Sequence, residues 1–183
     1  MNRKLKKALA ITVAAMQIPM LILWKIVYDT MHATSSAIKV GEGGGFYMEI
    51  DPAKLPAALL AYSPHILLLA ACMALSVWGL VRAIKGNDRS DLTAVLLYGG
   101  ISLSCLLLVF AFSVPISFEA SYYANLTTSE YTFYRYPFGL EINYRLIDVW
   151  PLMQSIKYVL LGATAAFSAA LCIGTLVEMK KRK

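Results

Sequence analysis

Four long runs of apolar residues, separated by short polar or turn-forming segments, constrain this chain more than any other feature. Each run has about 20 residues, the length that an α-helix needs to cross the roughly 30 Å hydrocarbon core of a bilayer. Hydrophobic residues make up 58% of the 183 residues and charged residues only 15%, whereas a soluble domain carries about 25% charged residues. The sequence therefore predicts one all-α membrane domain, a bundle of four transmembrane helices, and excludes a soluble enzyme. The spans are expected at about residues 8–28, 64–84, 92–114 and 153–177.

The distribution of basic residues indicates how the spans are oriented. Of the 17 Lys and Arg residues, eleven lie on the side that holds both termini and the short loop at about residues 85–91. The positive-inside rule assigns that side to the cytoplasm. We therefore expect an integral protein of the plasma membrane with cytoplasmic N- and C-termini. Its exoplasmic loops are expected at about residues 29–63 and 115–152.

The net charge of +6 is split among three short segments next to the membrane. This division argues against nucleic acid as a partner. It predicts the lipid bilayer as a partner, through a general attraction between basic side chains and anionic head groups.

All three cysteines, Cys72, Cys105 and Cys172, fall inside predicted spans. No CxxC pair and no zinc-ligand spacing is present. Cysteines buried in helices usually behave as small apolar residues. The sequence thus gives no reason to expect a metal site or a cofactor.

The first exoplasmic loop contains a glycine-rich segment, residues 41–45, between two β-prone runs at 37–40 and 46–50. Two such runs around a flexible turn are typical of a β-hairpin. A phosphate-binding loop is the alternative, but neither a GK[ST] sequence nor a helix start follows the glycines. A plain turn is favoured.

The second exoplasmic loop is rich in strand-forming and aromatic residues. Together with the hairpin it predicts a small exoplasmic β-rich cap, in which the strand at 46–50 lies beside a strand of the second loop. Aromatic side chains of such a cap form a binding face for a partner, or a sheet that rests on the helices with tyrosines at the lipid interface. The second interpretation is favoured. Six of the eleven tyrosines lie in this loop: Tyr122, Tyr123, Tyr131, Tyr134, Tyr136 and Tyr144.

Few polar residues interrupt the spans, and the most informative are Gln17, Lys25, His65 and Lys157. An ionisable group inside a membrane is by default a functional hypothesis, here a path for protons or ions. Three of these residues lie near helix ends, where long polar side chains reach water at low cost. We expect interfacial anchoring rather than a transport path.

The fourth span carries small residues at a spacing of four, namely Gly162, Ala166, Ala170 and Gly174. Such a stripe lets another helix approach closely. The neighbour is a helix of the same bundle or a helix of another subunit, and packing within the bundle is favoured.

No catalytic motif is present, whether a serine-hydrolase GxSxG, a zinc-protease HExxH or a Walker sequence. The leading hypothesis is a non-catalytic integral membrane protein, an accessory subunit or interaction module. It would bind a partner protein, or a second copy of itself, through its exoplasmic aromatic cap. A small oligomeric transporter or channel is the alternative. A membrane-embedded lipid-modifying enzyme, with exoplasmic carboxylates as acids or bases, is third.

Overall fold

The computed structural model describes residues 2–40, 46–85, 91–113 and 150–182. The described chain is mostly helical, and four of its helical segments are long and apolar enough to cross a membrane. These are Arg3–Tyr28, Leu55–Ile84, Leu92–Phe112 and Ser155–Lys181. The prediction of four helices able to span a membrane is therefore confirmed, and each overlaps the apolar run that predicted it.

The first span consists of two helices, α1 (Arg3–Ala15) and α2 (Gln17–Ser35), which meet at Met16. The side chain of Asn2 accepts a hydrogen bond from the backbone N–H of Lys4 and so caps the start of α1. The break follows from Pro19, which has no N–H to donate to the carbonyl of Ala15 and whose ring crowds that carbonyl. One apolar run thus forms a bent span.

Helix α3 (Leu55–Ile84) runs without a break through Pro64. The sequence analysis placed the start of the second span at Pro64, and the helix itself begins about two turns earlier. Pro64 cannot donate to the carbonyl of Leu60, but the hydroxyl of Ser63 donates to this oxygen at 2.8 Å. A hydroxyl that replaces the missing N–H lets a membrane helix continue past a proline.

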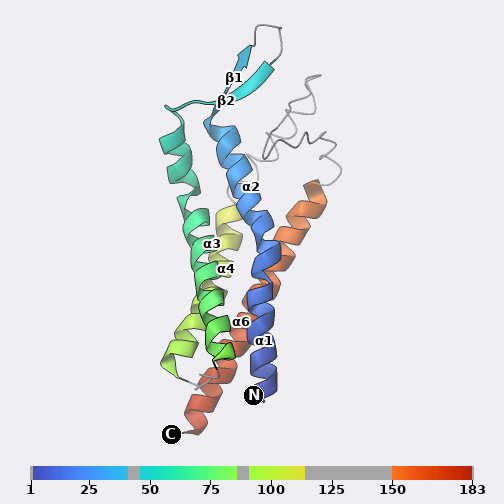
Figure 1. Cartoon of the computed structure of the whole chain (residues 1–183), viewed down its shortest axis with the longest axis vertical. Helices are drawn as coiled ribbons and strands as arrows, with labels where there is room; N and C mark the ends of the chain where they lie inside the picture. Colours follow the sequence, from blue (N-terminus) through green and yellow to red (C-terminus); the bar gives the residue numbers. More distant parts are fainter. Residues whose placement is uncertain (1, 41–45, 86–90, 114–149, 183) are drawn as a thin grey trace.

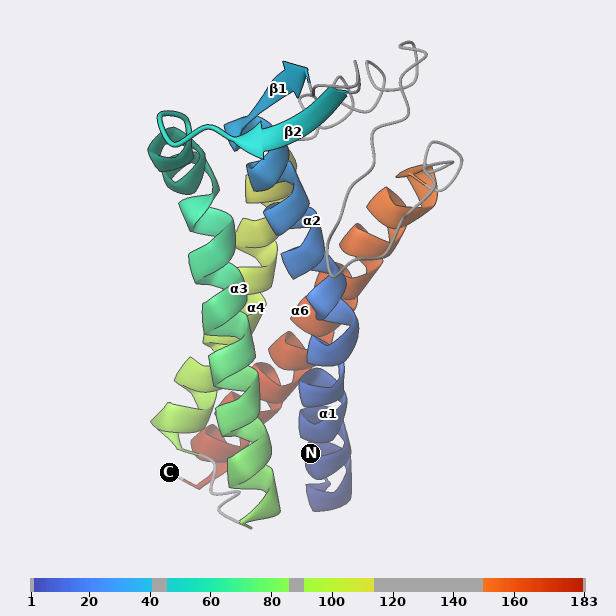
Figure 2. The same cartoon turned by 45° about the horizontal axis from the view of Figure 1, so that its top comes forward.

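The remaining helices are α4 (Leu92–Ser113) and α6 (Trp150–Lys181). α4 packs along both α3 and α6, while α1 packs against the same two helices and α2 against α3. The four spans therefore form a ring in which α4 lies opposite the bent first span (Figures 1 and 2). Side chains from all four spans meet at its centre, including Leu23, Leu69, Ile101 and Leu161, none of them more than 2% exposed.

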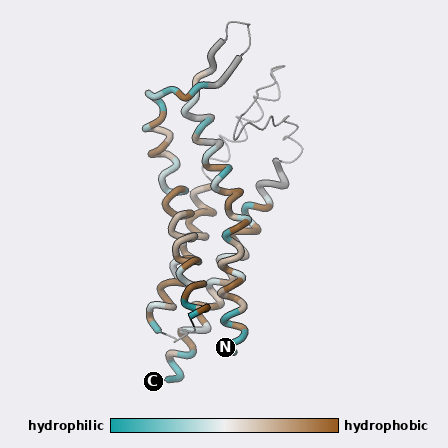
Figure 3. The backbone as a smooth tube through the Cα atoms, viewed as in Figure 1, coloured by the Kyte–Doolittle hydropathy of each residue, from teal (hydrophilic) through white to brown (hydrophobic). Residues whose placement is uncertain are grey.

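Large apolar side chains also cover the outside of the ring. Ile18 is 71% exposed, Leu60 77% and Phe110 70%. Helices that are apolar all round do not occur on the surface of a soluble bundle, but they suit contact with lipid. Figure 3 shows that hydrophobic residues run along the helices, with hydrophilic residues at the N- and C-terminal ends and at the start of α3.

Strands β1 (Ser36–Val40) and β2 (Phe46–Ile50) follow α2 and pair antiparallel, with Ser36 opposite Ile50 and Val40 opposite Phe46. They lie at one end of the bundle, whereas both chain termini lie at the other (Figure 1). Among the described residues the sheet has these two strands only. The larger cap and its pairing with the second loop concern residues 114–149, which lie outside the described residues.

Candidate functional site

Two of the four polar span residues, His65 on α3 and Lys157 on α6, come together around Phe112 near the end of α4. The ammonium nitrogen of Lys157 lies 4.6 Å from the centre of the Phe112 ring. The imidazole of His65 meets the same ring edge-on, with the ring centres 4.8 Å apart. Residues that are distant in sequence, on three helices, thus form one mixed polar and aromatic cluster, which we call the core cluster.

The two ionisable side chains of the core cluster are buried, whereas side chains that anchor a helix at the membrane interface reach water. Lys157 is 1% exposed and His65 3% exposed. The expectation that these two side chains reach water at the helix ends is therefore wrong. Both residues occupy the face of their helix that packs against neighbouring helices.

A hydrogen bond to the backbone determines which ring nitrogen of His65 carries the hydrogen. Nε2 lies 2.8 Å from the carbonyl oxygen of Ala111, and because a carbonyl only accepts, Nε2 carries the hydrogen and donates. In the neutral ring, Nδ1 is then an acceptor. Among the described residues it has no hydrogen-bond partner.

Lys157 brings a cationic group into the same interior. Its ammonium faces the Phe112 ring and lies 5.4 Å from the centre of the Tyr158 ring. A cation over aromatic faces is attracted by the ring quadrupole, more strongly where water is excluded. The core cluster therefore contains two chemically useful groups. The ammonium of Lys157 can bind an anion, and Nδ1 of His65 can accept a proton.

The other two polar span residues lie elsewhere. Gln17 is buried at the start of α2, and its amide donates to the backbone carbonyl of Val13 at 3.3 Å, within its own span. Lys25 is half-buried on α2. The structure thus assembles two of the four residues into one cluster.

Two of the three cysteines are in contact, a pairing that the sequence analysis did not identify. The Sγ atoms of Cys72 on α3 and Cys105 on α4 lie 3.6 Å apart, and both residues are fully buried. Both are free thiols. Among the described residues no group of three or more His, Cys, Asp or Glu side chains is arranged to hold a metal ion.

The small residues of α6 face outward. Gly162, Ala166 and Ala170 are exposed and Gly174 is half-buried. A Cβ atom added to Gly162 would meet nothing within 4 Å. Packing within the bundle, the favoured interpretation, does not hold for the exposed three, because α6 packs through its opposite side. That side carries Leu161, Thr164, Ser168, Leu171 and Thr175.

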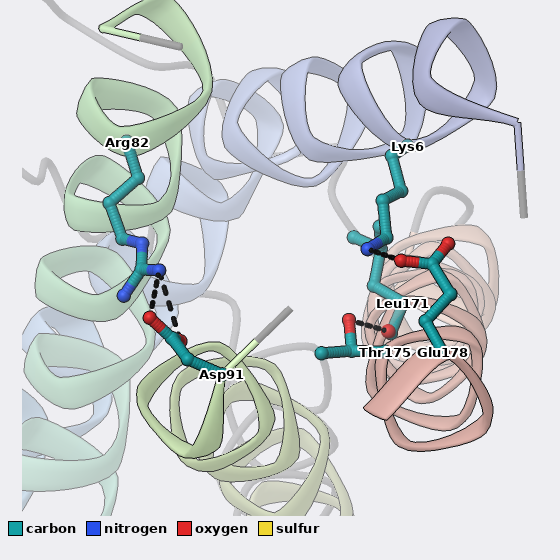
Figure 4. Close-up of polar contacts among 6 residues, drawn as sticks. All are labelled: Lys6, Arg82, Asp91, Leu171, Thr175 and Glu178. Atoms are coloured by element: carbon teal, nitrogen blue, oxygen red, sulfur yellow. Dashed lines mark hydrogen bonds and ion pairs between the residues drawn. The ribbon is translucent and has the colours of Figure 1, made fainter. Parts of the chain in front are cut away.

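Two ion pairs tie the helices together near the chain termini (Figure 4). Lys6 on α1 contacts Glu178 on α6, with Nζ 2.7 Å from Oε2. Arg82 on α3 donates to both carboxylate oxygens of Asp91, at 3.1 and 3.0 Å, across the short loop that leads to α4. The sequence analysis missed both pairs, although the shortness of that loop was a usable signal for the second.

Asp91 also begins α4, since its Oδ1 accepts the backbone N–H of Ala94 at 2.8 Å. Burial works to raise the pKa of the Asp91 carboxyl. The hydrogen bond from Ala94 and the adjacent Arg82 guanidinium outweigh it, and the pKa lies below its ordinary value.

The six tyrosines of the second loop, Tyr122, Tyr123, Tyr131, Tyr134, Tyr136 and Tyr144, lie outside the described residues. Their assignment to a partner-binding face stays a prediction.

Comparison of the chain with family models, with curated proteins and with solved structures finds no match.

Proposed function

We propose that this chain is a non-catalytic integral membrane protein that works by association, as an accessory subunit or interaction module. In this proposal the termini lie in the cytoplasm, the membrane is the plasma membrane, and the aromatic loop belongs to an exoplasmic β-rich cap that contacts the partner. The observation that carries the proposal is the outward-facing stripe of small residues on α6.

A stripe of this kind supports association for a simple physical reason. Lipid tails are as apolar as leucine, so spanning helices gain little by hiding apolar surface and associate where their backbones approach closely. Gly162, Ala166 and Ala170 leave the backbone of α6 open to such an approach over about two turns. Large exposed side chains such as Phe110 on α4 would keep a neighbouring helix at a greater distance.

The test enlarges the small residues and measures association in native membranes. Ala166→Ile and Ala170→Ile together fill the stripe. Ala70→Ile and Ala74→Ile make the same change, at the same spacing, on exposed positions of α3. The full chain and both double variants are extracted in polymer nanodiscs, and bound protein is quantified by native mass spectrometry.

The proposal expects one stoichiometric species, a partner protein or a second copy, that is lost from the α6 variant and kept by the α3 variant. Equal retention by both variants, or loss only from the α3 variant, would contradict it. The thermal stability of each variant is measured in parallel, because a misfolded chain would also lose its partner.

The core cluster supports a second candidate, the small oligomeric transporter or channel. A lysine and a histidine buried among aromatic rings are expensive to place in a membrane and often mark a path for ions or protons. The test is solute or proton flux into liposomes that contain the wild-type chain, His65→Phe or Lys157→Met. Flux that both substitutions abolish would favour transport over an accessory role, and the absence of flux in the wild type would remove this candidate.

A further inference from the structure

The first and last segments of the described chain carry most of its basic residues, and the structure places them side by side. Residues 2–7 contain four basic side chains, and residues 178–182 contain three with one carboxylate. The contact between Lys6 and Glu178 holds the start of α1 against the end of α6 (Figure 4). Two segments that look separate in sequence therefore form one basic surface.

The charges of this surface point outward. Lys6 and Glu178 satisfy each other and are only 11% and 22% exposed at their side chains. The sole carboxylate of the two segments is therefore already bound. Other basic side chains are exposed, Lys4 and Lys7 on α1 and Lys180, Lys181 and Arg182 at the end of α6. We call these five the terminal basic cluster.

Apolar side chains lie beside these charges and about one turn further into the helices. Leu5 and Ile11 on α1 are 51% and 44% exposed, and Leu176 and Val177 on α6 are 47% and 48% exposed. A ligand that contacts both the terminal basic cluster and these apolar side chains needs a negatively charged head and an apolar body. A soluble polyanion such as nucleic acid would contact the basic side chains only.

We propose that the terminal basic cluster is a binding site for an anionic phospholipid. Its phosphate would lie between the basic side chains of α1 and those of α6, and its acyl chains along Ile11 and Leu176. The partial positive charge at the N-terminus of α1 adds to the attraction. Because opposite sides of the site come from the two ends of the chain, a bound lipid would link the first span to the last.

The experiment uses the full chain, delipidated in a neutral detergent. The protein is titrated with dioleoyl phosphatidylglycerol, with zwitterionic dioleoyl phosphatidylcholine, or with soluble glycerol phosphate. Bound lipid is counted by native mass spectrometry, and the apparent Tm is followed in the same titrations. Lys7→Gln with Lys181→Gln weakens the cluster. Lys54→Gln with Lys85→Gln removes two exposed charges elsewhere and serves as the matched control.

Wild type and control are expected to retain phosphatidylglycerol in preference to phosphatidylcholine and to gain Tm from it. A surface charge contributes about 1 kcal/mol to the attraction, roughly fivefold in affinity, so the cluster variant should bind the anionic lipid at least about tenfold more weakly. Raising the ionic strength from about 0.1 M to about 1 M should reduce the preference in the wild type, because the screening length falls to about 3 Å.

Three results would overturn the proposal. The first is equal retention of the two lipids by the wild type, and the second is equal weakening in the cluster variant and the control. The third is a full Tm gain from glycerol phosphate alone, which would indicate a site for a soluble anion. Since all four substituted lysines are exposed, the variants should fold, and the circular dichroism of each checks this.

Discussion

Asp91 performs two tasks that substitution can separate. Its carboxylate caps α4 through the N–H of Ala94, and it pairs with Arg82 across the loop from α3. Asp91→Ala removes both interactions. Asp91→Asn keeps a side-chain oxygen for the cap, and Arg82→Gln keeps the whole aspartate, so each of these variants removes only the ion pair.

The expected magnitudes differ enough to measure. Loss of an N-cap costs about 1 kcal/mol. The carboxylate is 44% exposed, and an exposed ion pair contributes only about 0.5 kcal/mol. Asp91→Ala should therefore lower the free energy of unfolding by about 1.5 kcal/mol, roughly tenfold in the equilibrium constant, whereas Asp91→Asn and Arg82→Gln should each lower it by about 0.5 kcal/mol.

The assay is reversible unfolding by sodium dodecyl sulfate in mixed micelles, followed by far-ultraviolet circular dichroism. If Asp91→Asn proves as unstable as Asp91→Ala, the cap is not the dominant interaction. If Arg82→Gln is the most damaging of the three, the ion pair outweighs the cap. Either result would refute the reasoning from this geometry.

Acidification tests the same residue. Because the folded-state pKa of Asp91 lies below its ordinary value, the unfolded chain takes up the proton first. The contribution of Asp91 to stability is complete above the ordinary pKa, about 4, and is lost as the pH falls through the folded-state pKa. The difference in stability between wild type and Asp91→Asn should therefore shrink below about pH 4. A difference that grows in that range would contradict the assigned shift.

Further substitutions probe other contacts by the same assay. Gly79→Ala should be less favourable to stability than Gly162→Ala, because its Cβ would lie 3.2 Å from a Leu97 methyl carbon, whereas Gly162→Ala meets open space and should leave stability unchanged or raised. A double-mutant cycle of Lys6→Gln and Glu178→Gln should give a coupling of about 1 kcal/mol, and a value near zero would show that the pair does not hold α1 to α6. Phe112→Leu should cost about 2 kcal/mol through the lost cation–π contact, and a cost below about 0.5 kcal/mol would argue against that contact.

The spanning helices could be predicted because hydropathy and length can be read directly from the order of residues in the chain. The ends of the helices were harder to predict. Ser63 and Pro64 together resemble a helix start, but in the folded chain the serine hydroxyl supplies the hydrogen bond that the proline lacks. The helix therefore continues where the sequence signal suggests that it begins.

The core cluster could be predicted only in part. His65 and Lys157 stood out as ionisable residues within apolar spans, yet their burial depends on which faces of α3 and α6 meet α4. Phe112 carries no signal in the sequence, because it is one apolar residue among many. The outward direction of the small residues of α6 is likewise set by tertiary packing. Their spacing predicts a close helix contact but does not tell whether the stripe faces the bundle or its outside.

The length of α3 determines where the strand pair stands. Thirty helical residues extend over about 45 Å, against about 30 Å of hydrocarbon, and an ordinary tilt of about 20° shortens the projection by only a few ångströms. With Ile84 at one boundary, about 10–15 Å of the helix rises above the other, farther than a layer of lipid head groups. β2 ends at Ile50, just before this raised end (Figure 1). A bilayer placed in this way would leave the strands in water, within reach of a protein that never enters the bilayer.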